Sequence, residues 1–537
     1  MFPRLLIALT VAVGIAAPAK TQVTEPDAVA AIRATEHVEI QDDAYLPPAR
    51  DRRVRTTAFR HAEVGFFTVQ VNVDENGDNI VGDAANEPSI AVNPNDPNSI
   101  VIGWRQFDTI SSNFRQAGYG YTTNGGQSWT FPGVIEPGVF RSDPVLDADS
   151  TGTFYYNSLT VDGSDFLCHV FKSTDGGATW DEGTFAEGGD KQWMIIDKNP
   201  GIGQNNIYAY WTQWFSICFP GHFTRSYNGG MTYLSCIEVP GNPNWGTMAI
   251  GPDHELYVCG DGFSVAKSSN AKYAIGTMTW DFSRVVNLDG GIVFGGGPNP
   301  GGLSGQAWIA ADNSDGPYRG NVYLLCSVWR SSTSDPLDVM FARSEDGGDN
   351  WSDPIRVNDD PGDDAYQWFG TMSVAPNGRI DVIWLDTRAD PGGYDSVLHY
   401  SYSEDAGQTW SASEPLTPAF DPHLGWPQQN KMGDYFDMVS DNAGVHLAYA
   451  ATFNGEQDVY YARIQPSPPL CPGDLNCDGV VDFDDIDPFV AALGCPSGDP
   501  NCWDPTCPWL NGDVNDDGTV DFDDIDPFVA RIGVTCP

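Results

Sequence analysis

Basic residues are scarce in this chain. Its 537 residues include 27 Lys and Arg against 73 Asp and Glu, which gives a formal net charge of −46. Nucleic acids and anionic membranes carry charge of the same sign and would repel it. We therefore expect no nucleic-acid partner, whereas an exported soluble protein or a calcium-binding protein fits this balance.

Several catalytic and membrane signals are also missing. The eight His are scattered without a zinc spacing such as H-E-x-x-H. The sequence has no serine nucleophile elbow and no phosphate-binding loop. Its apolar run, residues 5–17, is too short to span a bilayer, so we predict no membrane span.

The ends of the chain differ in composition from its middle. Residues 1–19 are typical of a secretory signal, with Arg4 before the apolar run and small residues at 17–19. Residues 20–63 form a polar N-terminal segment, and residues 64–464 form the main domain. A Pro-rich linker at 465–470 leads to a small tail at 471–537. We expect a secreted or cell-surface protein.

Eleven cysteines divide between the tail and the main domain. Six lie in the tail: Cys471, Cys477, Cys495, Cys502, Cys507 and Cys536. Disulfides are expected there, with fifteen possible pairings. Among the other five, Cys218 and Cys236 flank one predicted hairpin and can pair across it. An odd number is then left, so we expect at least one buried thiol.

An eight-residue pattern recurs five times in the main domain. Its copies begin at residues 122, 173, 226, 344 and 403, and the second reads STDGGATW. Asp175 can accept backbone hydrogen bonds, Gly176-Gly177 supplies positive φ, and Trp180 can bury its ring beneath the turn. The starts are 51, 53, 118 and 59 residues apart, and 118 is close to two periods. This spacing predicts an array of small sheets.

The octet resembles the Asp-box, S-x-D-x-G-x-T-W, of sialidases and other BNR-repeat proteins. In that superfamily the box joins the two outer strands of a propeller blade and lies away from the active site. The resemblance implies an all-β fold, an Asp-box β-propeller.

A longer repeat predicts the number of blades. Two strands around a turn recur in seven units, which begin at Glu87, Asp143, Lys191, Asn244, Gln306, Gln367 and Asp434. The fourth unit carries a stretched turn, Ser268 to Trp280, without a clean box. The seventh lacks an outer strand, which Phe66 to Val73 can supply to close the ring. We favour seven blades, and six blades plus an extra hairpin is the alternative.

One rim of such a propeller holds the starts of the inner strands and the ends of the second strands. Trp, Asp and Arg gather at these positions, a combination that suits a sugar. Sialidases hold the substrate carboxylate with three arginines and attack with a tyrosine. The resemblance implies a clamp of Arg105, Arg330 and Arg388, with Tyr435 as nucleophile and Asp190 as acid. We expect a carbohydrate-active protein with a glycan substrate or ligand; a non-catalytic propeller that binds glycan or protein is the alternative.

The tail contains two matching acidic loops, residues 474–485 and 513–524. Oxygen donors stand at loop positions 1, 3, 5, 9 and 12, glycine stands at position 6, and position 7 offers a backbone carbonyl. This is the EF-hand pattern, and Ca²⁺ prefers such a cage of oxygens. The predicted ligands are Asp474, Asn476, Asp478, Val480, Asp482 and Asp485 in the first loop and Asp513, Asn515, Asp517, Thr519, Asp521 and Asp524 in the second.

Each loop is followed by nearly the same short helix, IDPFVAALG or IDPFVARIG. A duplicated loop and helix resembles a dockerin type I module, over roughly residues 473–534. The resemblance implies a cohesin-like partner or a surface scaffold.

Overall fold

The computed structural model describes residues 43–45, 54–163, 165–466, 471–495, 502–503, 507–515 and 517–536. The predicted signal at 1–19, most of the polar segment at 20–63 and residues 467–470 of the linker lie outside them. Among the described residues, no helix combines the length and apolarity needed to cross a membrane.

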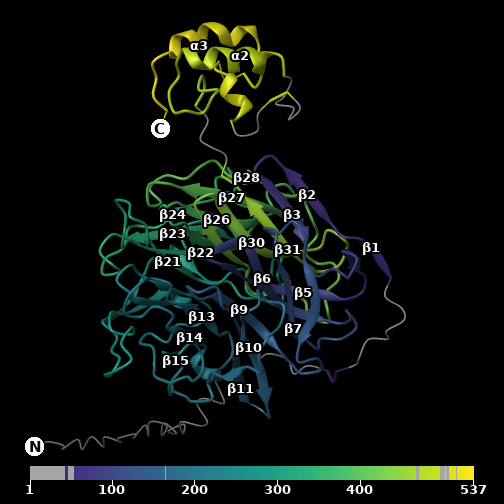
Figure 1. Ribbon diagram of the computed structural model, residues 1–537, viewed down its shortest axis with the longest axis vertical. Helices are drawn as coiled ribbons and strands as arrows, with labels where there is room; N and C mark the ends of the chain where they lie inside the picture. Colours follow the sequence, from purple (N-terminus) through teal and green to yellow (C-terminus); the bar gives the residue numbers. More distant parts are fainter. Residues whose placement is uncertain are drawn as a thin grey trace, which may run out of the picture. The chain divides into compact units, whose positions relative to one another are not determined.

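The main domain is a seven-bladed β-propeller (Figure 1). Apart from the ribbon of β1 (Arg55–Thr57) and β4 (Asp78–Ile80), its strands form seven antiparallel sheets. The innermost strands neighbour one another in a closed cycle, β5, β9, β13, β16, β21, β25, β29 and again β5. The predicted seven blades are confirmed.

Each blade is built from strands that are consecutive in the chain. The first blade holds β5 (Ala84–Asn93), β6 (Asp96–Phe107), β7 (Gln116–Thr122) and β8 (Thr130–Ile135), and the second holds β9 (Ser142–Ala148), β10 (Phe154–Asp162), β11 (Asp165–Ser173) and β12 (Thr184–Phe185). The third blade holds β13 (Trp193–Ile196), β14 (Ile207–Tyr210) and β15 (Phe223–Ser226), and the fourth holds β16 (Met248–Ile250), β17 (Leu256–Cys259), β18 (Ser264–Ser268) and β19 (Phe282–Val285). The fifth blade holds β21 (Trp308–Ala311), β22 (Val322–Arg330), β23 (Asp338–Ser344) and β24 (Ile355–Arg356), with β20 (Gly290–Gly291) paired to β22, and the sixth holds β25 (Gln367–Val374), β26 (Ile380–Asp386), β27 (Val397–Ser403) and β28 (Glu414–Pro415).

The seventh blade joins the two ends of the propeller. Its strands β29 (Asp437–Asp441), β30 (Gly444–Ala451) and β31 (Asp458–Ile464) are completed by β3 (Phe66–Gln70) and β2 (Arg60–Glu63). Phe66 pairs with Ile464 and Gln70 with Tyr460. The strand expected from residues 66–73 therefore closes the ring and covers the edge of β31.

Side chains tie neighbouring blades together around the axis. At six junctions, a side-chain oxygen accepts a backbone N–H from the next blade. The pairs are Asp437 and Ile90, Ser89 and Leu146, Asp147 and Ile196, Thr247 and Ile309, Ser327 and Gly370, and Ser373 and Ser440, with distances of 2.8–3.1 Å. These bonds satisfy backbone donors that no strand within the blade can reach.

The predicted turns share one hydrogen-bonding pattern. In the second copy, the Ser173 hydroxyl accepts from Gly177 N at 2.9 Å, and Asp175 accepts from Thr179 N at 2.9 Å. In the fourth blade, Ser268 accepts from Ala271 N, and Asn270 accepts from Thr279 N at 2.9 Å. The stretched turn of the fourth unit is therefore a sixth Asp-box, with extra residues between its two halves.

Four disulfides are present. Cys218 and Cys236 are bonded, as expected, and the tail pairs Cys471 with Cys536, Cys477 with Cys507 and Cys495 with Cys502. Cys168, Cys259 and Cys326 are buried thiols. Such disulfides are typical of exported proteins.

The tail is a small helical unit. Its helices α2 (Ile486–Leu493) and α3 (Ile525–Arg531) each follow a 3₁₀ turn, η3 (Phe483–Asp485) or η6 (Phe522–Asp524). Asp482 and Asp521 cap these turns in matching capping boxes. The rings of Phe489 and Phe528 stack with their centroids 4.8 Å apart, which joins the two repeats in one core.

Candidate functional site

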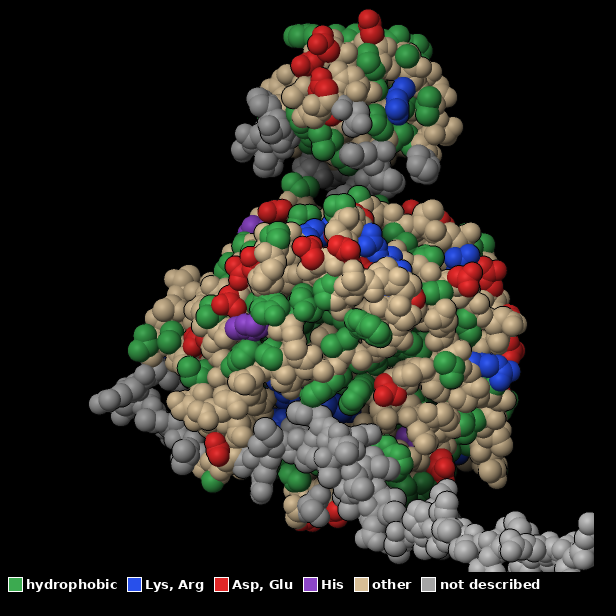
Figure 2. Space-filling view, turned by 180° about the vertical axis from the view of Figure 1, so that it is seen from behind, with side chains coloured by type: hydrophobic (Ala, Val, Ile, Leu, Met, Phe, Trp, Pro, Cys, Tyr) green, Lys and Arg blue, Asp and Glu red, His purple; other side chains and the backbone are tan. Residues whose placement is uncertain are grey.

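Two rims of the propeller have different characters. The inner strands begin at one rim, which we call the entry rim, and the turns after the third strands lie at the other, the Asp-box rim. The entry rim is where the predicted site residues fall. In Figure 2, acidic side chains are spread over the visible face and basic ones are fewer, in keeping with the net charge of −46.

Backbone strain recurs at the entry rim. Five blades hold a residue other than glycine with positive φ at the start of the inner strand: Glu87 (49°), Asp143 (45°), Lys191 (56°), Trp245 (53°) and Phe369 (55°). Strand register shifts at this point in three of these blades. A bulge re-aims side chains, and its recurrence makes it a property of the fold.

Three consecutive blades place a charged residue, Glu87, Asp143 or Lys191, at this position of positive φ, and these charges join in a buried line. We call Arg105, Glu87, Lys431, Asp434, Lys191 and Asp143 the axial ion chain, in order of contact. The nitrogen–oxygen distances along it are 3.1, 3.5, 2.9, 2.5 and 3.6 Å, and none of these side chains is more than 8% exposed. Opposite charges alternate, which offsets much of the cost of removing them from water.

The axial ion chain sets unequal proton affinities. Burial raises the pKa of Glu87 to about 7 although Arg105 and Lys431 lie beside it. Burial also acts on Asp434, but the charges of Lys191 and Lys431 hold its pKa well below its usual value. One carboxyl of the cluster can therefore carry a proton near neutral pH while its neighbour stays ionised.

Two loops meet over the axial ion chain. The loop of residues 295–304 contacts residues 430–434: Gly301 N donates to Asn430 O at 2.7 Å, and Leu303 N donates to Asp434 at 2.9 Å. Asn299 bonds Gly433 O at 2.8 Å and accepts from Met432 N. These contacts fix the two loops to each other.

The structure brings three of the predicted catalytic residues into this region. Arg105 is fully buried, and its two terminal nitrogens have no hydrogen-bond partner among the described residues. The Tyr435 hydroxyl donates to Pro144 O at 2.8 Å, and burial raises its pKa well above the usual value. Asp190 is also buried, and its charge acts on Lys191. In this arrangement Tyr435 is held as a protonated hydrogen-bond donor.

The other two predicted arginines contact different carboxylates. Arg330 pairs with Asp289 and Asp338, each at 3.0 Å. Arg388 pairs with Asp359 at 2.7 Å and Asp386 at 2.8 Å. Each guanidinium is thus neutralised within its own surroundings. The clamp of three arginines and the roles of Tyr435 and Asp190 stay predictions.

Sequence reasoning passed over Glu87, Lys191, Lys431 and Asp434 as a connected group. A signal was available for three of them, because Glu87, Lys191 and Asp434 begin their repeat units, as Asp143 does. The contacts of Lys431 come from a loop outside the repeat, and no periodic pattern points to them.

Aromatic side chains also lie at the entry rim. Trp329, at the end of β22 beside Arg330, is 54% exposed. It pairs across the sheet with Gly291, which has no side chain to cover the ring. The rings of Trp214 and Phe219 stack 5.7 Å apart, and those of Tyr366 and Tyr394 meet edge to face at 5.8 Å. This rim combines aromatic surfaces with carboxylates.

The two tail loops have the same internal geometry. Asp485 accepts from Leu475 N, Asn476 N and Asp482 N, and Asp524 accepts from Val514 N, Asn515 N and Asp521 N, all at 2.7–3.0 Å. At position 1, Asp474 accepts from Asp478 N and Gly479 N, and Asp513 accepts from Asp517 N and Gly518 N. The backbone thus folds both loops around their carboxylates.

No family model matches the chain. A curated relative, a probable oligoxyloglucan-reducing end-specific xyloglucanase of Neosartorya fischeri, is 25% identical over 311 residues, which cover 58% of this chain and 32% of that protein. The chain thus spans about a third of the relative's length. A Dyadobacter fermentans protein of unknown function is 14% identical, with a TM-score of 0.42 over 75% of this chain and 100% of that one. The endosialidase of phage phi92 is 9% identical, with a TM-score of 0.41 over 75% and 70%.

Proposed function

We propose that the chain is an exported carbohydrate-binding propeller whose C-terminal tail binds Ca²⁺ and docks to a scaffold. The propeller recognises a glycan at the entry rim, and the tail attaches the protein outside the cell. The proposal of glycan recognition rests mainly on the exposed ring of Trp329, which lies beside Arg330 and several carboxylates. Aromatic faces stack on sugar rings, and carboxylates accept bonds from sugar hydroxyls.

A glycan ligand has support from outside the rim as well. The curated relative is named for action on oligoxyloglucan. The secretory signal predicted at residues 1–19 and the four disulfides fit an extracellular setting, where polysaccharides are met.

Glycoside hydrolysis of the sialidase type is the second candidate, and the axial ion chain favours it. A carboxyl whose pKa lies near 7, as at Glu87, suits a general acid at neutral pH. Arg105 beside it has two terminal nitrogens without a hydrogen-bond partner among the described residues, and a substrate carboxylate would satisfy both. Hydrolysis would require the loops at 295–304 and 430–434 to separate.

The tail residues fit Ca²⁺. Asp474, Asn476, Asp478, Asp482 and Asp485, with the carbonyl of Val480, would hold one ion; Asp513, Asn515, Asp517, Asp521 and Asp524, with the carbonyl of Thr519, would hold the other. All donors are oxygens, as a hard cation requires, and the paired geometry suits two equal sites. The bound ions would neutralise clustered carboxylates and stabilise the fold.

The tail also offers a surface for a docking partner. Corresponding apolar side chains are exposed in both repeats: Phe483, Ile486 and Val490 in the first, and Phe522, Ile525 and Val529 in the second. Phe483 is 73% exposed and Phe522 76%. Exposed apolar rows on helices are typical of protein contacts. A cohesin-like or other scaffold surface is the proposed partner.

Binding of the full chain to immobilised sialosides, xyloglucan oligosaccharides and other neutral glycans tests the propeller. We expect binding to at least one glycan, and chromatography of the same mixtures detects cleavage. Cleavage that falls in Glu87→Gln, which removes the carboxyl proposed as general acid, would favour the hydrolase. Absence of binding across all of these glycans would refute the proposal for the propeller.

Calorimetry of the full chain with CaCl₂ tests the tail. We expect two ions per chain and a higher unfolding temperature of the tail in Ca²⁺ than in EDTA. The absence of binding heat at millimolar Ca²⁺ would refute this part, and the glycan result would still stand.

A further inference from the structure

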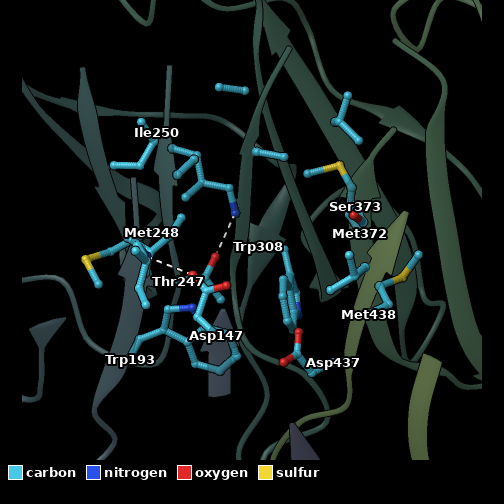
Figure 3. Close-up of a pocket in the computed structure, with 18 of the residues that line it drawn as sticks. Asp147, Trp193, Thr247, Met248, Ile250, Trp308, Met372, Ser373, Asp437 and Met438 are labelled. Atoms are coloured by element: carbon cyan, nitrogen blue, oxygen red, sulfur yellow. Dashed lines mark hydrogen bonds between the residues drawn. The ribbon is translucent and has the colours of Figure 1, made fainter. Parts of the chain in front are cut away.

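A cavity lies on the propeller axis, on the side of the inner strands that faces the Asp-box rim. It has a volume of about 330 Å³ and is lined by inner strands of all seven blades. Figure 3 draws Asp147, Trp193, Trp308 and Asp437 close together around it. The volume falls at the small end of the range of about 300–1,000 Å³ for small-molecule sites.

Aromatic rings close the cavity toward the entry rim. Trp193 meets Trp308 edge to face with centroids 5.2 Å apart, and it meets Tyr435 in the same way at 5.5 Å. These rings separate the cavity from the axial ion chain. A ligand in the cavity would rest against indole surface and would not reach the entry rim.

The cavity wall offers hydrogen-bond donors as well as acceptors. The hydroxyls of Thr247 and Ser373 accept backbone N–H bonds at 3.0 Å. The Ser373 proton is then available to donate, whereas the Thr247 proton can also point to Cys259 Sγ, 4.0 Å away. Asp437 accepts from the Ser89 hydroxyl and from Ile90 N through one oxygen, Oδ2. Asp147 and Asp437 can accept bonds from a ligand through their further lone pairs.

Charges around the cavity disfavour ionic ligands. Lys198 at its mouth is bound to Asp147 at 2.5 Å, and its ammonium would repel a cation. Asp147 and the net charge of −46 would repel an anion. A neutral molecule with hydroxyl donors and acceptors is repelled by neither set of charges. Its C–H face can lie on the ring of Trp193 or Trp308.

We propose that this axial cavity is a second binding site, for one neutral sugar unit, entered from the Asp-box rim. The site is separate from the entry rim and does not depend on the function proposed for that rim. It would give the propeller two sugar-binding faces, so a single molecule could hold two chain ends or two branches of a glycan.

Saturation-transfer NMR of the full chain with D-glucose, D-galactose and D-xylose, each at millimolar concentration, tests this site. The variant Ala310→Phe adds a ring into the cavity without removing a hydrogen bond, because Ala310 lines it from β21. Ala412→Phe adds the same ring at an exposed position and is the control. Choline serves as a cationic probe.

In the Trp329→Ala background, which removes the sugar contact proposed at the entry rim, we expect transfer to at least one sugar, no loss when Ala412→Phe is added and at least a fivefold loss when Ala310→Phe is added. Equal signals in Ala310→Phe, or transfer to choline and to no sugar, would overturn the proposal. Should Ala310→Phe fail to fold, ¹⁹F NMR of the fluorotryptophan-labelled chain decides. The sugar must then shift the Trp308 resonance, and an unmoved resonance counts against the site.

Discussion

Asp437 offers a quantitative test of how the propeller holds its axis together. This carboxylate lies at the start of β29 and accepts from the Ser89 hydroxyl at 2.6 Å and from Ile90 N at 3.1 Å, which joins the last blade to the first. It is only 7% exposed, and burial raises its pKa to about 7. The substitution Asp437→Asn keeps an oxygen that can accept both bonds and removes the charge.

The pH dependence has a defined sign. Unfolded Asp437 ionises near its ordinary pKa of 3.8, whereas the folded residue keeps its proton up to about pH 7. Between these values the native state binds more protons, so stability falls as pH rises. At 1.36 kcal/mol per pKa unit, the free energy of unfolding of the natural chain falls by about 4 kcal/mol across this range because of Asp437 alone. The amide that replaces this carboxyl in Asp437→Asn cannot titrate, so the variant is spared this loss.

Urea unfolding of both proteins at pH 4, 5, 6, 7 and 8 measures the effect. We expect Asp437→Asn to be less stable or equal at pH 4 and more stable by about 2–4 kcal/mol at pH 8, with the difference growing between pH 4 and 7. Asp441→Asn is a suitable control, because Arg463 and His446 lower the pKa of Asp441 and the sign is opposite. A stability difference for Asp437→Asn that does not change with pH would refute the reasoning.

Three further variants test the turns, the disulfide and the tail. Gly177→Ala places a Cβ 2.4 Å from Val101 at a φ of +87° and should destabilise the propeller by about 2–3 kcal/mol, whereas Gly77→Ala, at +82° in open space, should cost only about 1 kcal/mol; equal melting points would contradict this. Cys218→Ser with Cys236→Ser opens a bridge between residues 18 apart and should lower the free energy of unfolding by about 3 kcal/mol; an unchanged urea midpoint would speak against it. Asp485→Ala should reduce the Ca²⁺ stoichiometry from two ions per chain to one. Asp484→Ala changes a residue outside the ligand set and should leave the stoichiometry at two. If calorimetry still finds two ions in Asp485→Ala, the first loop is ruled out as a calcium site.

Local repeats explain why much of the fold could be predicted. The octets carry their turn chemistry within eight residues, so Asp175 and Gly177 indicate the same bend wherever the pattern recurs. Phe66–Gln70 has a strand pattern outside the seven units, and the seventh unit lacks an outer strand, so the sequence favours pairing the two. The fourth turn was unclear in sequence because Asn270 and Thr279 are nine residues apart, while the corresponding residues in the other turns are four apart.

The site depends on contacts that no period describes. Lys431 reaches Glu87 across more than three hundred residues, and Asn299 meets Gly433 from another loop. The three predicted arginines looked equivalent in sequence because each ends a strand. In the structure, Arg105 is buried against Glu87, whereas Arg330 and Arg388 have acidic partners of their own. Only the folded arrangement separates them.

Glycan recognition at the entry rim is tested most directly by one affinity comparison. The dissociation constant of the best-bound glycan is measured for the natural chain, for Trp329→Ala and for Ile275→Ala, which removes a 91% exposed apolar side chain elsewhere. Loss of a stacked ring costs about 1.5 kcal/mol, so Trp329→Ala should bind about tenfold more weakly. Ile275→Ala should bind as the natural chain does. Equal affinity in all three proteins would contradict a sugar site at Trp329.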